Sequence, residues 1–291
     1  MIELRVAITK DIDFFHIDLV FERILPYYQE RQIVFDFSSC SFIRPDVLIM
    51  LVTVSEFIYS RVKRFVIWRN AAKEVRGYLD RMGISNLHSI VLEHSIWAGR
   101  GKISSQSPVL VELSTIEKPE HISDAIQQTK RILLNSLDKS KQFQQHLITL
   151  LKETVENSVE HSREESETGT CYYALQKYTY KYSNDTELYI VVGDIGIGML
   201  QSQRVMYPDT RDDAEAIFQA IINGRTGRLN GRGGMGFASV KTALEPVNGV
   251  LTIRSGKGLG VYDPVKAKLK IYRRSANYPG TQILFKIKLD K

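Results

Sequence analysis

The sequence lacks the residues that usually stabilise small secreted or metal-bound domains. It has two cysteines among 291 residues, Cys40 and Cys171, which lie far apart in strand-like contexts. A disulfide or a zinc site is therefore not expected, and a reducing cytoplasmic location is. No run of 18 apolar residues occurs, and the N-terminal MIELRVAITKD has no signal-peptide pattern. The sequence thus predicts neither a membrane span nor export.

A strong excess of charge of either sign is also missing. The 39 Lys and Arg residues exceed the 33 Asp and Glu residues by only six charges. Basic residues cluster at residues 61–69, 225–232 and 266–274, and the first and third clusters are more typical of solvated surfaces than of nucleic-acid sites. The aromatic tract YYALQKYTYKY, at residues 172–182, alternates like a strand and does not indicate base stacking. Nucleic acid is not an expected partner.

The first hundred residues alternate between strand and helix patterns. Strands are expected at residues 2–9, 32–37 and 64–68, and helices at residues 13–28, 46–60 and 71–82. This alternation predicts a small α/β domain over residues 1–105. A stretch with glycines, serines and a proline, residues 88–108, is expected to join it to a second domain over residues 106–291.

One stretch of the second domain, residues 150–162, combines two stripes on a predicted helix. Its sequence, LLKETVENSVEHS, places Glu153, Asn157 and His161 on one polar stripe at four-residue spacing. A second, apolar stripe suited to packing on a sheet comprises Leu147, Leu151, Val155 and Val159. The amide oxygen of Asn157 is a suitable Mg²⁺ ligand, and the carboxylate of Glu153 can deprotonate a water or hydroxyl. Polar stripes are commonly only solvated faces, so this segment alone does not define a function.

Two glycine-containing segments follow this helix. The first, LYIVVGDIGIGM at residues 188–199, is an apolar strand that ends at Asp194 and continues with Gly196 and Gly198. A buried carboxylate needs hydrogen-bond donors, and the amine of an adenine is a suitable one. The second, GRGGMGFASVK at residues 231–241, is a glycine-rich loop that leads into a helix. Backbone N–H groups at such a helix start favour an anion.

The order of these three segments resembles the GHKL ATP-binding fold of gyrase-type ATPases, heat-shock chaperones, MutL-type repair proteins, histidine kinases and anti-sigma-factor kinases. The resemblance covers roughly residues 120–289. It implies that Glu153 is the general base, that Asn157 holds Mg²⁺, and that Asp194 binds the adenine of ATP. It further assigns nucleotide contacts to Gly196, Gly198, Arg225, Gly231, Arg232, Gly233, Gly234, Met235, Gly236 and Thr281. For His161, a bond to lid backbone or phosphate and a structural role at the helix end both stay open.

This resemblance also implies an architecture for the second domain. It is an α/β sandwich with helices on one face of a mixed sheet. Further strands are expected at residues 109–114, 250–254, 266–273 and 281–289, with a helix at residues 122–137. A lid over the phosphates is expected at residues 199–230, with a helix at residues 212–222.

Individual residues indicate which GHKL subfamily the sequence resembles. Sensor histidine kinases usually carry Asn at the position of Glu153, whereas Glu, Asn and His at four-residue intervals resemble the anti-sigma-factor serine kinases. Gyrase and MutL relatives continue into a transducer domain that contributes a phosphate-contacting lysine. This sequence stops at Lys291, immediately after the last expected strand. Any effect of ATP is therefore expected to reach a partner through the N-terminal half or the lid.

A second resemblance concerns the N-terminal domain. The segment IVFDFSSCSFIRPDVLIMLV is similar to the STAS fold of anti-sigma-factor antagonists, with Asp36, Phe42, Ile43 and Leu48 at matching positions. The position of the phospho-acceptor serine holds Pro45 instead. The resemblance therefore implies a docking module that is not a substrate of its own kinase-like half.

Together these features predict a cytoplasmic, Mg²⁺-dependent ATP-binding regulatory protein. It is expected to hydrolyse ATP and thereby switch protein–protein interactions. Two alternatives stay open, a serine/threonine kinase similar to the anti-sigma factors and an ATP-gated adaptor without hydrolysis. A role in DNA repair or topology is a weaker alternative. The expected partner is a protein, a homodimer is possible, and no membrane is involved.

Overall fold

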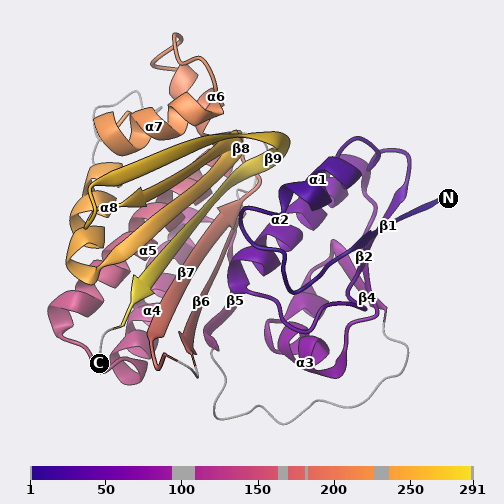
Figure 1. Ribbon diagram of the computed structural model, residues 1–291, viewed down its shortest axis with the longest axis horizontal. Helices are drawn as coiled ribbons and strands as arrows, with labels where there is room; N and C mark the ends of the chain where they lie inside the picture. Colours follow the sequence, from indigo (N-terminus) through magenta and orange to yellow (C-terminus); the bar gives the residue numbers. More distant parts are fainter. Residues whose placement is uncertain (1, 94–108, 163–169, 181–182, 226–235, 290–291) are drawn as a thin grey trace. The chain divides into compact units, whose positions relative to one another are not determined.

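The computed structural model describes residues 2–93, 109–162, 170–180, 183–225 and 236–289 (Figure 1). The chain forms two compact units, Met1–Ser107 and Pro108–Lys291. The boundary expected from the sequence, between residues 105 and 106, falls in the undescribed range 94–108 and stays a prediction. None of the helices in the described ranges is both long enough and apolar enough to cross a membrane.

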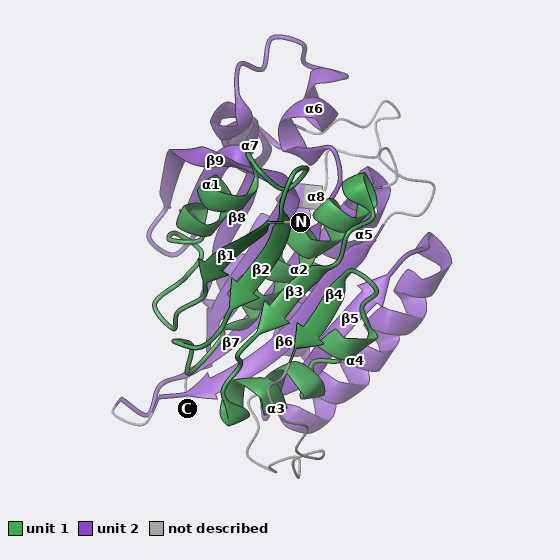
Figure 2. Ribbon diagram, turned by 90° about the vertical axis from the view of Figure 1, so that its right-hand side faces the viewer, with its two compact units in different colours: residues 1–107 green, residues 108–291 purple. Residues whose placement is uncertain are grey.

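Unit 1 is built on a parallel sheet, whose four strands Figure 2 shows side by side. In spatial order they are β1 (Glu3–Ala7), β2 (Gln32–Asp36), β3 (Val66–Arg69) and β4 (Ile90–Glu93). The helices are α1 (Asp18–Ile24), α2 (Pro45–Val62), α3 (Lys73–Arg81) and the 3₁₀ turn η1 (Ile84–Asn86). The strand–helix alternation predicted for this region is confirmed, with β4 as an additional strand in the stretch expected to be a linker.

Two local features explain the helix limits in unit 1. Pro45 occupies the first turn of α2, where its missing N–H has no intrahelical partner to lose. The helix predicted from residue 13 begins only at Asp18, because Asp13 organises a turn before it. Its Oδ1 accepts hydrogen bonds from the backbone N–H groups of Phe15 and His16, at 2.8 and 2.9 Å.

Unit 2 consists of a five-stranded sheet with helices on one face. The strands, in spatial order, are β5 (Val109–Ile116), β6 (Cys171–Thr179), β7 (Thr186–Asp194), β9 (Lys268–Lys288) and β8 (Gly249–Asp263). The helices and 3₁₀ turns are η2 (Pro119–His121), α4 (Ile122–Ser136), α5 (Lys141–Ser162), α6 (Gly198–Arg204), α7 (Asp213–Asn223), α8 (Gly236–Leu244) and η3 (Glu245–Val247). Apolar residues of α4, α5 and α8 form one core with the sheet (Figure 1). The predicted α/β class is thus confirmed.

The sheet of unit 2 differs from the expectation in two respects. All strand pairs in its described part are antiparallel, whereas a mixed sheet was expected. Three strands were expected after residue 249, but the chain forms two long ones, β8 and β9. Their pairing register is irregular at Ser255 to Gly258, and both strands continue past this point. A bulge bends a strand without ending it, so interruptions of the apolar pattern there do not mark strand ends.

Helix α5 is placed by its apolar stripe. Leu147, Leu151, Val155 and Val159 are at most 1% exposed and belong to the core. Beside them runs a stripe of small hydroxyl residues, Thr154, Ser158 and Ser162, which is also buried. Thr154 and Ser162 donate their hydroxyls back to helix carbonyls, so that these two donors are paired where the stripe approaches the sheet.

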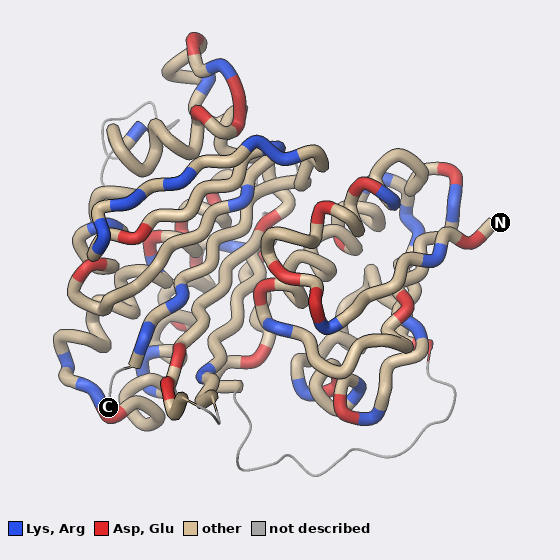
Figure 3. The backbone as a smooth tube through the Cα atoms, in the orientation of Figure 1, with Lys and Arg blue, Asp and Glu red and all other residues tan. Residues whose placement is uncertain are grey.

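Charged residues are spread over both units (Figure 3). The basic cluster at residues 266–274 lies on the β8–β9 hairpin, where some of its charge is paired. Lys266 lies 3.0 Å from Asp263, and Arg273 lies 2.9 Å from Asp212. Such partly paired strand residues are common on solvated faces, and the absence of a nucleic-acid partner stays a prediction.

Candidate functional site

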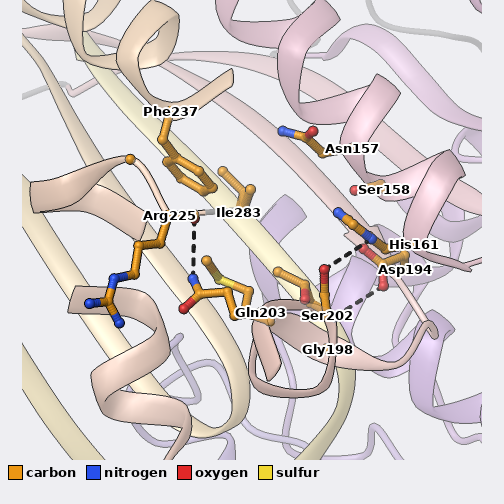
Figure 4. Close-up of a pocket in the computed structure, with 13 residues that line it drawn as sticks. Asn157, Ser158, His161, Asp194, Gly198, Ser202, Gln203, Arg225, Phe237 and Ile283 are labelled. Atoms are coloured by element: carbon orange, nitrogen blue, oxygen red, sulfur yellow. Dashed lines mark hydrogen bonds between the residues drawn. The ribbon is translucent and has the colours of Figure 1, made fainter. Parts of the chain in front are cut away.

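An open cavity in unit 2 brings together the ends of several elements (Figure 4). Its empty space, together with the solvent at its open mouth, measures about 650 Å³. It is lined by Asn157, Ser158, His161, Asp194, Gly198, Met199, Ser202, Gln203, Gly224, Arg225, Phe237, Thr281 and Ile283. These residues come from α5, the end of β7, α6, the end of α7, α8 and β9. The cavity therefore joins the helix layer to the sheet.

Among the described residues that line the cavity, Asp194 is the acidic one. It ends β7 and is only 2% exposed. Its Oδ1 accepts hydrogen bonds from the backbone N–H groups of Gly196, at 2.9 Å, and Thr281, at 3.1 Å. Burial raises the pKa of Asp194 to about 6, although these two donors and the Ser158 hydroxyl oppose that rise. A carboxylate can accept about four hydrogen bonds, so Asp194 keeps capacity for a donor from a ligand.

Ser255 supports this arrangement from the sheet. Its hydroxyl accepts a hydrogen bond from the backbone N–H of Met199, at 2.9 Å. The same oxygen lies 3.1 Å from Thr281 Oγ1 and 3.2 Å from the carbonyl oxygen of Gly280. Ser255 thereby ties the start of α6 to β9, beside the strand end that carries Asp194. No pattern in the sequence indicated this role.

The two glycines after Asp194 have different roles. A Cβ at Gly196 would lie 2.5 Å from the carbonyl oxygen of His161, so this glycine lets the turn pack against the backbone of α5. Gly196 therefore faces protein backbone, whereas the resemblance had assigned nucleotide contacts to both glycines. Gly198 lines the cavity and begins α6 with a φ of +77°, a conformation that favours glycine.

His161 lies at the end of the polar stripe of α5 and contacts α6. Its Nδ1 is 3.3 Å from the hydroxyl oxygen of Ser202, a contact drawn in Figure 4. Both side chains line the cavity. Two roles were considered for His161, a bond to the lid backbone or phosphate and a structural role at the helix end. The structure shows the contact with Ser202, which links α5 and α6 at the wall of the cavity.

Arg225 follows α7 and is one of the residues that line the cavity. Gly224 ends the helix in the left-handed conformation, and the backbone N–H of Arg225 donates to the carbonyl of Gln219, at 3.2 Å. The guanidinium lies 4.6 Å from the centre of the Tyr207 ring and 4.0 Å from Asp209 Oδ1. A cation stacked on an aromatic ring is held in a defined position without losing its charge.

The sequence of the second unit matches a known family. Residues 142–291, just over half of the chain, match the family described as histidine kinase-, DNA gyrase B-, and HSP90-like ATPases. The chain belongs to this ATPase family. No curated protein matches the chain. Membership of the family establishes an ATP-binding domain, as the order of the three motifs had predicted.

The structure brings many of the predicted ATP-site residues of this ATPase domain together. Those that line the cavity are Asn157, His161, Asp194, Gly198, Arg225 and Thr281. Glu153 lies one turn before Asn157 on α5, is half-buried, and is not among the lining residues. Gly231, Arg232, Gly233, Gly234 and Met235 lie outside the described residues. Gly236 begins α8, the helix whose next residue, Phe237, lines the cavity.

Several cavity residues were not predicted as site residues. They are Ser158, Met199, Ser202, Gln203, Gly224, Phe237 and Ile283. Ser158 had a sequence signal, because it belongs to the hydroxyl stripe beside the apolar stripe of α5. Ser202 and Gln203 had none, since their seven-residue helix has no amphipathic repeat long enough to recognise.

The residues present fit an ATP-bound Mg²⁺ better than a resident metal site. Within the described ranges, no group of three or more His, Cys, Asp or Glu side chains is arranged to hold a metal ion. Asn157, in contrast, lines the cavity and carries a hard amide oxygen. Mg²⁺ commonly keeps several waters and binds one or two protein oxygens together with substrate phosphates. Asn157 is the residue that would hold it.

Proposed function

We propose that the chain is a Mg²⁺-dependent regulatory ATPase, which hydrolyses ATP and thereby switches its contacts with a protein partner. The observation that carries the proposal is the buried Asp194 carboxylate, held by two backbone donors at the wall of a cavity that Asn157 also lines. A buried acceptor of fixed orientation suits the exocyclic amine of adenine. Asn157 suits the metal that accompanies the phosphates.

The other residues of the site complete these roles. Arg225 supplies positive charge for the phosphates, and the N-terminus of α8 at Gly236 supplies backbone donors and the positive end of the helix dipole. Glu153, one turn from Asn157, is the base that orients and deprotonates the nucleophile. Bound Mg²⁺ would neutralise phosphate charge during the transfer.

The choice of nucleophile separates the leading function from two alternatives. If the nucleophile is water, the protein is an ATPase switch. If it is a hydroxyl of a partner, the same residues make a serine/threonine kinase, and the Glu–Asn–His spacing of α5 is the feature that favours this. An adaptor that only senses ATP needs no base, so the presence of Glu153 is an argument against it.

The test is an incubation of the full chain with γ-labelled ATP and Mg²⁺, following free phosphate and label on protein. Wild type is expected to release phosphate, and Glu153→Ala to lower the rate about 10²- to 10⁴-fold while ATP affinity is kept. Glu156→Ala is the matched control, because Glu156 lies on the same helix and pairs with Lys152 at 3.8 Å. Label on protein would establish a kinase instead. Tight binding without turnover in wild type would contradict the ATPase proposal and support the adaptor.

The partner is part of the same proposal. We place its binding surface on the N-terminal unit or around the lid, with a second copy of the chain as another possible occupant. Size-exclusion chromatography with light scattering, with and without a non-hydrolysable ATP analogue, tests the homodimer. An unchanged monomer mass in both conditions would leave a different protein as the partner.

A further inference from the structure

The guanidinium of Arg225 is directed away from the part of the cavity that carries Asp194. Arg225 is one of the lining residues, yet Figure 4 shows its guanidinium pointing away from Asn157 and Asp194. The group lies 4.6 Å from the centre of the Tyr207 ring and 4.0 Å from Asp209 Oδ1. Neither Tyr207 nor Asp209 is among the residues that line the cavity. The segment that follows α6 therefore holds this charge away from Asn157 and Asp194.

Hydrogen bonds fix the segment that holds Arg225. The N–H of Tyr207 donates to the carbonyl of Gln203, at 2.8 Å, and the N–H and hydroxyl of Thr210 both donate to the carbonyl of Tyr207, at 3.1 and 2.9 Å. Arg204 Nε donates to the carbonyl of Thr210, at 3.0 Å. In the same region, Nε2 of Gln203 lies 3.4 Å from the carbonyl oxygen of Arg225. The backbones of Tyr207 and Arg225 are thus both held to Gln203, which keeps the ring and the guanidinium together.

The two contacts of the guanidinium are of a kind that a phosphate can displace. The side chains of Arg225 and Asp209 are 28% and 78% exposed, and cation–π and ion-pair contacts at exposed positions are weak. A phosphate accepts two parallel charge-assisted hydrogen bonds from one guanidinium, which is a stronger interaction. We propose that Tyr207 and Asp209 are positioning residues that compete with the phosphates of ATP for the guanidinium of Arg225, and thereby lower the affinity for ATP. This inference rests on the proposed function, which assigns Arg225 to the phosphates.

The competition affects only ligands that carry phosphate groups. When ATP binds, the free energy of the two contacts is lost, so the apparent dissociation constant rises by the inverse of the fraction of molecules in which Arg225 is released. Adenosine has the same base and sugar but no group that binds the guanidinium. A substitution that removes the contacts should therefore tighten the binding of ATP and leave that of adenosine unchanged. A substitution that only disturbs the fold would weaken the binding of both ligands.

The experiment measures the affinities for Mg²⁺-ATP and for adenosine by titration calorimetry on the full chain. Tyr207→Leu removes the aromatic ring and Asp209→Asn removes the charge. Each is expected to bind ATP about two- to fivefold more tightly than wild type. Tyr207→Phe keeps the ring and is expected to keep the wild-type affinity for ATP. All three variants are expected to bind adenosine like wild type.

Arg225→Met tests whether the effect passes through the guanidinium. Alone it is expected to weaken ATP binding, and the addition of Tyr207→Leu or Asp209→Asn is expected to cause no further change. Tightening that persists in the Arg225→Met background would overturn the inference, because Tyr207 and Asp209 would then act independently of Arg225. Wild-type ATP affinity in Arg225→Met would overturn it too, as would unchanged or weaker ATP binding in both Tyr207→Leu and Asp209→Asn. If wild type binds neither ATP nor adenosine, the proposed function itself fails, an outcome distinct from binding that the variants do not alter.

Discussion

A substitution at Asp194 tests ligand recognition separately from folding. Asp194→Asn keeps one oxygen for the N–H groups of Gly196 and Thr281, but it turns a donor toward the amine of adenine. We expect ATP affinity to fall about 10- to 100-fold and the preference for ATP over GTP to shrink. Burial disfavours the ionised carboxylate, so the melting temperature at pH 7.5 without nucleotide should not fall.

The measurement is titration calorimetry with ATP and GTP, beside a thermal melt. Asp185→Asn, at an exposed position between β6 and β7, is the control for the substitution. Wild-type affinity and nucleotide preference in Asp194→Asn would overturn the assignment of adenine to Asp194. A large loss of stability would show that the carboxylate is needed mainly for folding.

The raised pKa of Asp194 also implies a pH dependence. The pKa is about 6 in the free protein because burial disfavours the ionised form, and a ligand amine favours that form. ATP affinity is therefore expected to be full above pH 7 and to fall as the pH drops through 6, by at most about tenfold per pH unit. The pKa in the folded state lies above that of an unfolded Asp, so this group adds stability as the pH falls from 6 toward 4.

The phosphates of ATP titrate as well, so the comparison needs a reference. Calorimetry at pH 7.5 and pH 5.5 on wild type and Asp194→Asn supplies it, since the phosphate contribution is common to both. The fall in affinity should be smaller in the variant. Equal falls in the two proteins would mean that Asp194 does not titrate in this range.

At the scale of elements, the packing of α7 on β8 depends on glycines. A Cβ at Gly258 would lie 2.6 Å from the carbonyl oxygen of Asp213, and one at Gly260 would lie 2.5 Å from Ile217 Cγ2. We expect Gly258→Ala to lower the free energy of unfolding by about 1–3 kcal/mol, because backbone at the start of α7 must move. Urea unfolding followed by circular dichroism measures this change.

Gly77 provides a matched control for that substitution. It lies within α3, and a Cβ there would meet no atom within 4 Å. Gly77→Ala is expected to raise the free energy of unfolding by about 0.5–1 kcal/mol, because alanine is the better helix former. A similar loss in both variants would contradict the packing argument.

Some helices and strands could be predicted from the sequence and others could not. The stripes of α5 were readable because a 22-residue helix repeats its pattern over several turns. Helix α6 was missed, since seven residues that begin at Gly198 repeat nothing. The missed strand β4 has four residues, IVLE, beside a stretch with the composition of a linker. The length of β9 was also missed, because bulges interrupt its alternation.

The sequence also predicted only some of the residues of the site. Asp194, Gly198 and Thr281 were assigned from the order of motifs, and the register of β7 with β9 places Asp194 beside Thr281. The support from Ser255 and the position of Gln203 depend on contacts between elements far apart in sequence. A linear pattern carries no information on such contacts, so these residues needed the structure.

At the scale of the whole molecule, the cavity and the family match both belong to the second unit. ATP at 100 times its dissociation constant should stabilise the state that binds it by about 2.7 kcal/mol. We expect the resulting protection from hydrogen exchange in the elements around the cavity: α5, the end of β7 and the Thr281 end of β9. Exchange of β1 to β4 in unit 1 then reports whether that unit responds to the nucleotide.

Hydrogen exchange with mass spectrometry, with and without Mg²⁺-ATP, measures both units in one experiment. Asp194→Asn is the control, because changes caused by binding at the cavity must shrink in this variant. Protection that extends into β1 to β4 would support switching through the N-terminal unit, since an effector coupled to a second surface must change its equilibrium. Protection confined to the second unit would move the partner surface to that unit. No protection around α5 and β7 would contradict the assignment of the cavity to ATP.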